Sequence, residues 1–127
     1  MTIALWSLLA AIFMPWVLTI FAKAPAAKQG QYDNRSPRIS LNQLQGLSQR
    51  ANWAQQNSFE ILPGYIAAVL VAHMAGANQA TLDWLAVIFI LSRILFAICY
   101  LKDWSTLRSL VWTLGVACIV AMFIISI

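Results

Sequence analysis

Long apolar segments separated by short polar ones dominate the chain. Each apolar segment holds about 20 residues, and the four segments lie at about 3–22, 52–74, 82–101 and 106–127. About 20 helical residues, at about 1.5 Å each, cross a hydrocarbon core of about 30 Å. We therefore expect four transmembrane helices. The first should be retained rather than cleaved as a signal peptide, because no basic residue precedes it and it exceeds the usual length of such a peptide.

The polar segments between the predicted helices differ in charge. The first loop, 23–49, and the turn 102–105 carry basic residues, whereas the loop 76–81 has none. Because Lys and Arg favour the cytoplasmic side, we expect both basic segments there and both chain ends outside. Residues 39–50 are expected to form a short surface helix. Ser105 is a candidate N-cap for the last helix.

The composition agrees with one membrane domain over residues 1–127. Hydrophobic residues make up 61% and charged residues 9% of the chain, whereas soluble proteins have about 25% charged residues. The net charge of +4 follows the loops, so we expect membrane lipids and no nucleic acid as partners. Cys99 and Cys118 stand alone in apolar segments, and we expect buried thiols and no metal site. The predicted fold class is an all-α integral membrane protein with a bundle of four transmembrane helices.

Two charged residues lie deep inside the predicted helices. Glu60 is about ten residues into the second helix, and Arg93 is nine residues before Lys102, so both lie about 13–15 Å deep at the helical rise. An unpaired charge at that depth is costly. We therefore predict a Glu60–Arg93 ion pair. An alternative interpretation is that this pair only fixes the register of the two helices.

The spacing of further polar residues places them on the same helix faces. Arg50 and Asn57 are seven residues apart and Glu60 is three further on, while Arg93 and Tyr100 are also seven apart. Such spacings put side chains on one face of a helix. A face rich in donors suits a carboxylate-bearing, peptide-like ligand. Tyr100 also fits the alternative of an interfacial aromatic anchor.

Arg108 lies in the first turn of the fourth predicted helix. The positive end of that helix and the guanidinium together would favour an anion and lower the pKa of a thiol bound there. The alternative is a residue that only extends its charge to the interface. His73 is the single histidine; we interpret it as an interfacial residue and expect no serine or cysteine triad.

Taken together, these positions resemble the pattern of a known family. The MAPEG proteins (membrane-associated proteins in eicosanoid and glutathione metabolism) have a similar pattern, which here reads Arg50, Asn57-x-x-Glu60-x-x-Pro63, Arg93, Tyr100 and Arg108. The resemblance covers nearly the whole chain and is nearest to bacterial-type members. It implies a homotrimer of four-helix protomers in a bacterial inner membrane.

The resemblance also implies a glutathione site between neighbouring subunits, near the cytoplasmic side. The cofactor glutathione would be bound by Arg50, Asn57, Glu60, Arg93 and Tyr100. Arg108 would be the catalytic residue and stabilise the thiolate. The implied function is a membrane-bound glutathione-dependent transferase or peroxidase that acts on lipophilic electrophiles or lipid hydroperoxides.

Two positions depart from the family pattern. Trp53 stands where glutathione-using members often have an arginine, and Trp112 where some have a tyrosine. Arg50 or Lys23 could replace the missing cation. Because the family includes a non-catalytic lipid-binding member, the lipoxygenase-activating protein, the alternative function is a lipid-binding or scaffold protein of the same fold. A small transporter or channel subunit is disfavoured because the polar residues stop at mid-depth.

Overall fold

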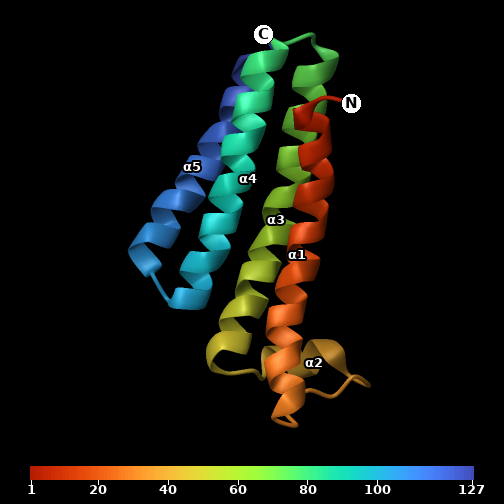
Figure 1. Ribbon diagram of the computed structural model, residues 1–127, viewed down its shortest axis with the longest axis vertical. Coiled ribbons are helices and arrows are strands. Elements are labelled where there is room, and N and C mark those ends of the chain that lie inside the picture. The colour runs from red at the N-terminus through yellow and green to blue at the C-terminus, as the bar shows by residue number, and fades with distance from the viewer.

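The computed structural model describes residues 1–127 and contains helices but no strands (Figure 1). This confirms the predicted all-α class. Four long helices lie side by side, and a short helix lies at one end of the bundle. In chain order the helices are α1 (Ile3–Lys28), α2 (Pro37–Asn42), α3 (Gly46–Met74), α4 (Gln79–Lys102) and α5 (Ser105–Ile124).

Three of the helices, α1, α4 and α5, are long and apolar enough to cross a membrane. Their lengths fit an integral membrane protein. Helix α3 has 29 residues, but its first part is polar and includes Gln55, Gln56 and Asn57. That α3 forms a fourth spanning helix remains a prediction.

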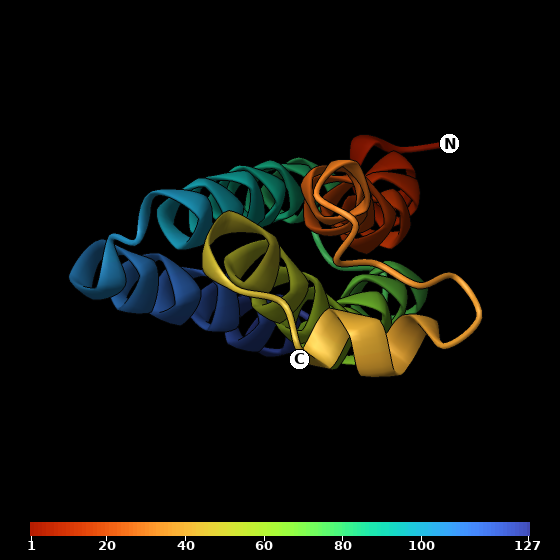
Figure 2. The same cartoon turned by 90° about the horizontal axis from the view of Figure 1, so that it is seen from below.

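The long helices form two neighbouring pairs. Helix α1 packs mainly against α3, and α4 packs mainly against α5, while α3 also contacts both α4 and α5. Figure 2 shows α2 lying across the bundle axis beside α3. Both chain ends lie at one end of the bundle, whereas α2 and the turn between α4 and α5 lie at the other (Figure 1). The two basic segments therefore share one end of the molecule, and which side of a membrane that end faces remains a prediction.

Helix α1 is longer than its hydropathy indicates. It continues to Lys28 instead of ending near residue 22, and it passes through Pro25. Ala22 and Ala26 are fully buried along this extension. Packing of this kind stabilises a helix more than its intrinsic propensity does.

The segment between α1 and α3 is correspondingly short. Instead of one surface helix over 39–50, the chain forms α2 and then begins α3 at Gly46, where φ is +61°. Glycine adopts this conformation without steric cost. The buried side chain of Leu44 anchors the segment between the two helices.

The predicted N-cap at Ser105 is wrong. Ser105 is already the first residue of α5, and Trp104 occupies the cap position without a side-chain hydrogen bond. The chain turns at Asp103, whose φ of 61° is left-handed. Only Asp103 and Trp104 separate α4 from α5, so the residue before α5 is Trp104 and Ser105 is already helical.

A polar contact and an aromatic pair join α1, α3 and α4. Tyr65 of α3 stacks on Phe89 of α4, with ring centroids 3.7 Å apart. Its hydroxyl lies 2.5 Å from the Ser7 hydroxyl of α1 in a buried hydrogen bond. Helices in a membrane associate through close packing and hydrogen bonds of this kind. These contacts therefore position α1 and α4 relative to α3.

Gly115 allows α4 and α5 to approach each other closely. A Cβ atom at this position would lie 3.1 Å from Ser92 Oγ of α4. Cys118 and Met122 continue the same buried face of α5. Small residues commonly permit such close helix contacts in membranes.

Gly115→Leu should therefore lower the melting temperature of the protein in detergent by several degrees, because overpacking a tight contact costs about 1–3 kcal/mol. Circular dichroism during heating measures this change. Gly64→Ala is the control, since a Cβ atom there would meet only Ile119 Cδ1, at 3.9 Å. If both variants melt like the wild type, α4 and α5 do not pack tightly at Gly115.

Candidate functional site

Arg93 of α4 is a cation inside the helix bundle. It is 2% exposed, and its Nη2 donates a hydrogen bond to Asn57 Oδ1 at 2.9 Å. The guanidinium carbon lies 4.1 Å from the centroid of the Phe96 ring. Its Nε and Nη1 atoms are buried and have no hydrogen-bond partner. Buried donors on a cation are costly when they have no partner, so Arg93 is held inside the bundle at an energetic cost.

Glu60 does not form the predicted ion pair with Arg93. It is exposed on α3, and its Oε2 accepts a hydrogen bond from Asn57 Nδ2 at 3.3 Å. Asn57 in turn accepts the bond from Arg93. Asn57 lies one turn before Glu60 on the same face of α3 and stands between the two charged residues. The carboxylate therefore polarises Asn57 without neutralising Arg93.

Arg108 and Tyr100 meet near the turn between α4 and α5. The Arg108 guanidinium carbon lies 4.3 Å from the centroid of the Tyr100 ring. That ring packs edge-on against Phe96, with centroids 5.2 Å apart. Arg108 is half-buried in the first turn of α5, where the helix contributes a partial positive charge. The cation–π contact holds Arg108 in place and leaves its charge unneutralised.

One cleft of about 400 Å³ lies between α3, α4 and α5, beside Tyr100 and Arg108. The cleft, termed the basic cleft below, is lined by Asn57, Phe96, Tyr100, Arg108, Ser109, Trp112 and Thr113. Its volume lies within the range of about 300–1,000 Å³ typical of ligand pockets. Arg93 contacts two of the lining residues, Asn57 and Phe96. The cleft thus combines one lining cation, Arg108, with several hydrogen-bonding groups and an aromatic wall. Arg93 is buried behind Asn57 and Phe96.

The sequence interpretation assigned no site role to some of the lining residues. These are Phe96, Ser109, Trp112 and Thr113. Phe96 lies three residues after Arg93 and four before Tyr100, so the helical spacing that connects those two also indicates Phe96. Trp112 likewise follows Arg108 by one turn. Spacing could have found these two, whereas short hydroxyl side chains give no comparable signal.

Arg50 lies outside the basic cleft. Its Nη2 donates to the backbone carbonyl of Leu101 at 3.3 Å, near the C-terminal end of α4. The partial negative charge of a helix C-terminus attracts a cation. Arg50 does face α4, as its spacing indicates, but its contact within the chain is with the backbone. A role in ligand binding remains a prediction.

Trp53 and Lys23 also lie away from the basic cleft. Trp53 is exposed on α3. The Lys23 amino group lies 5.3 Å from the centroid of the Tyr32 ring, near the end of α1. Within one chain, therefore, the indole of Trp53 does not fill the cleft, and Lys23 does not add a cation to it.

The remaining reactive side chains form no second cluster. Cys99 and Cys118 are free and buried, as expected for small apolar side chains. His73 is exposed near the end of α3. No group of three or more His, Cys, Asp and Glu residues lies close enough together to hold a metal ion. The chemistry-bearing side chains inside the bundle are thus concentrated around the basic cleft.

Comparison with known proteins gives one result that spans the chain. A model of the MAPEG family matches residues 3–127. The match includes the four long helices and all residues of the basic cleft. No curated protein and no solved structure matches the chain.

The hydrogen-bond chain predicts that Asn57→Ala destabilises the protein more than Glu60→Gln. Asn57→Ala leaves Arg93 Nη2 without an acceptor, and an unsatisfied buried donor costs about 1–3 kcal/mol. Glu60→Gln retains an oxygen that can accept from Asn57 at an exposed position. Melting in detergent, followed by circular dichroism, compares the two variants. A larger loss for Glu60→Gln would mean that the carboxylate compensates Arg93.

Proposed function

The chain belongs to the MAPEG family, and we propose that it is a membrane-bound glutathione-dependent transferase or peroxidase. Membership of the family supports a glutathione-related role at a membrane in general terms. The observation that carries the more specific proposal is the basic cleft, with Arg93 and Arg108 held by neutral partners beside a cavity of about 400 Å³. The substrates would be lipophilic electrophiles or lipid hydroperoxides.

Glutathione suits the residues of this cleft. It has two carboxylates, an ammonium group and a thiol on a peptide backbone. The charge of Arg93, which lies behind Asn57 and Phe96, would attract a carboxylate, while Asn57 and the Tyr100 hydroxyl suit peptide groups. Glu60 would accept the ammonium group. Arg50, which lies outside the basic cleft beside the C-terminal end of α4, is the proposed partner of the second carboxylate.

Arg108 is the proposed catalytic residue. When bound, glutathione would supply the nucleophilic thiol. The Arg108 guanidinium, at the positive end of α5, would stabilise negative charge on that sulfur. Tyr100 holds Arg108 through the cation–π contact, so the charge is positioned in advance. Phe96 and Trp112 would form the apolar wall for a substrate that enters from the bilayer.

Glutathione titration of the purified protein in detergent tests this proposal. We expect saturable binding, with ultraviolet difference absorbance of a thiolate near neutral pH. Arg108→Ala should bind glutathione within about tenfold of the wild type but lose the thiolate signal and about 10²–10³-fold in kcat/KM. Lys102→Ala is the matched control, because it removes an exposed positive charge from the neighbouring turn outside the cleft. Wild-type activity of Arg108→Ala would show that the assignment is wrong.

The second candidate function is a non-catalytic lipid-binding or scaffold protein of the same fold. The exposed Trp53 favours it, because glutathione-using relatives often have an arginine at that position and this chain has one cation fewer. The aromatic wall of Phe96 and Trp112 would then contact a lipid. The same titration separates the two functions, since this candidate requires that millimolar glutathione does not bind.

We further propose that the protein is a homotrimer in a bacterial inner membrane, with the basic segments cytoplasmic. Helix α3 exposes Trp53, Gln56 and Glu60, which lie on one face at helical spacing. A carboxylate that faces lipid at this depth is costly. Contact with other copies of the chain would cover this face and bring a neighbouring α3 to the edge of each glutathione site.

Native mass spectrometry in detergent should therefore give three times the chain mass of 14.1 kDa. Gln56→Glu adds a second carboxylate four residues from Glu60 on the exposed face, and like charges at this spacing repel. We expect this variant to shift the population toward smaller species. Gln31→Glu, which makes the same change in the exposed first loop, should remain trimeric. A monomeric wild-type protein would contradict the proposed assembly.

A further inference from the structure

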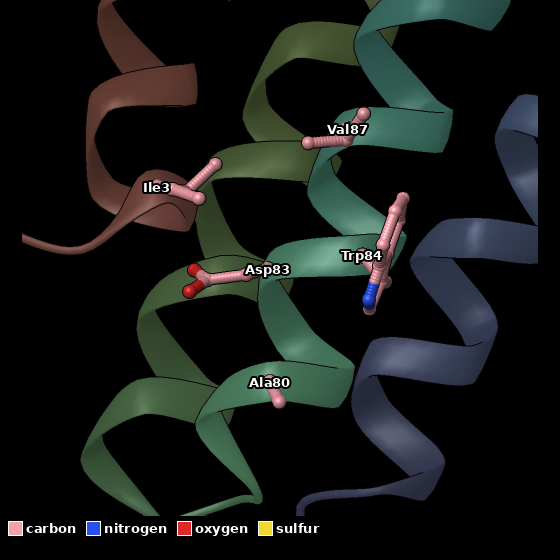
Figure 3. A pocket seen from close by; sticks show the side chains of 5 residues that line it. All are labelled: Ile3, Ala80, Asp83, Trp84 and Val87. Carbon is pink, nitrogen blue, oxygen red and sulfur yellow. The ribbon is translucent and has the colours of Figure 1, made fainter.

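A groove runs between the N-terminal halves of α1 and α4, at the end of the bundle away from the basic cleft. It consists of two adjoining hollows of about 280 Å³ each, which share Ile3 and Val87. Ala80, Asp83 and Trp84 complete the first hollow (Figure 3). Trp6, Ser7, Ala10, Ile90 and Leu91 complete the second. From Ala80 to Leu91 the groove follows α4 for about 16 Å at the helical rise.

Asp83 is the one charged side chain that lines this groove. Its Oδ1 accepts hydrogen bonds from the Ala4 amide of α1 at 2.7 Å and from Gln79 Nε2 at 2.9 Å. Both bonds go to the same oxygen, so Oδ2 remains available to another donor. In Figure 3 the carboxyl group points toward α1 and lies near Ile3. The structure thus holds a carboxylate in a defined position at the polar end of an apolar groove.

Two tryptophans stand beside the groove. Trp6 is 56% exposed and Trp84 is 69% exposed. Tryptophan side chains gather at the boundary between lipid and water. In Figure 3 the nitrogen of Trp84 lies at the end of the ring on the side of Ala80 and does not meet the carboxyl group of Asp83. Its N–H can donate to a phosphate or ester oxygen while the ring stays in contact with lipid.

We propose that this groove binds a phospholipid with a primary ammonium head group, of the phosphatidylethanolamine type. The ammonium donates to Asp83 Oδ2, and the Trp84 N–H donates to a phosphate or ester oxygen. One acyl chain lies along Val87, Ala10 and Leu91. The carboxylate repels an anionic head group, and a quaternary ammonium has no N–H to donate. The site shares no residue with the basic cleft, so it does not depend on the proposed function.

Native mass spectrometry of the full chain with defined lipids tests this inference. The lipids share the same acyl chains and differ only in the head group: phosphatidylethanolamine, its mono- and dimethyl derivatives, phosphatidylcholine and phosphatidylglycerol. We expect the mono- and dimethyl lipids, which keep an N–H, to bind, and affinity to fall at the choline lipid, which has none. The ethanolamine lipid should bind about tenfold more tightly than the choline lipid, as for one hydrogen bond between charged groups. Phosphatidylglycerol should also bind more weakly than the ethanolamine lipid.

Asp83→Asn supplies the decisive variant. Its amide oxygen can still accept from the Ala4 amide, so the contact between α1 and α4 is kept, but the preference for the ethanolamine lipid should disappear. Asp103→Asn is the matched control, because it removes the same charge at the left-handed turn at the other end of α4, where asparagine is tolerated. This control should keep the preference.

The remaining outcomes are also decisive. Equal binding of the ethanolamine and choline lipids to the wild-type protein would overturn the proposal, whether or not Asp83→Asn folds. A preference that persists in Asp83→Asn would do the same. Ala10→Phe fills the second hollow and should weaken all the lipids alike. Unchanged lipid binding in that variant would show that no acyl chain lies in the groove.

Discussion

A buried guanidinium without a carboxylate partner is the constraint on which the arrangement of α3 and α4 depends. Arg93 is enclosed by the bundle, and unsatisfied donors in a membrane cost several kcal/mol each. Asn57 accepts from one of its nitrogens, and the Phe96 ring faces the cation. Because an amide and a ring are neutral, the positive charge of Arg93 persists. A direct pair with Glu60 would have cancelled that charge, and an anion in the basic cleft would then gain little from it.

The packing of α5 against α4 brings a second cation, Arg108, to the basic cleft, while Arg93 lies buried behind two of the residues that line it. Gly115 permits the close approach, and Arg108 then lies over the Tyr100 ring near the end of α4. Two positive charges near one cleft repel each other. The rings of Phe96 and Tyr100 attract both guanidinium groups without adding negative charge. The fold therefore places two guanidinium groups at or beside the basic cleft, each held by neutral partners.

Hydropathy and helical spacing were sufficient to predict the helical class. They could not identify the partner of Arg93, because Asn57 and Glu60 share one face of α3 a single turn apart and depth alone does not separate them. They could not predict the bond from Arg50 to the Leu101 carbonyl either. Every residue has a backbone carbonyl, so the side-chain sequence does not indicate which carbonyl accepts a hydrogen bond. The extension of α1 to Lys28 could not be predicted from hydropathy either, because it depends on the burial of Ala22 and Ala26 against the bundle.

The residues of the basic cleft also limit the kind of chemistry that it can support. Ser109 and Thr113 are its two aliphatic hydroxyls, and each donates to a backbone carbonyl one turn earlier in α5. No histidine, cysteine or carboxylate lines the cleft, so neither hydroxyl has an adjacent base that could activate it as a nucleophile. In the proposed transferase or peroxidase, the reactive group would therefore arrive with the ligand. In that function the chain would position the ligand and place positive charge where negative charge develops. Arg108, held by the Tyr100 ring, and the buried Arg93 would supply that charge.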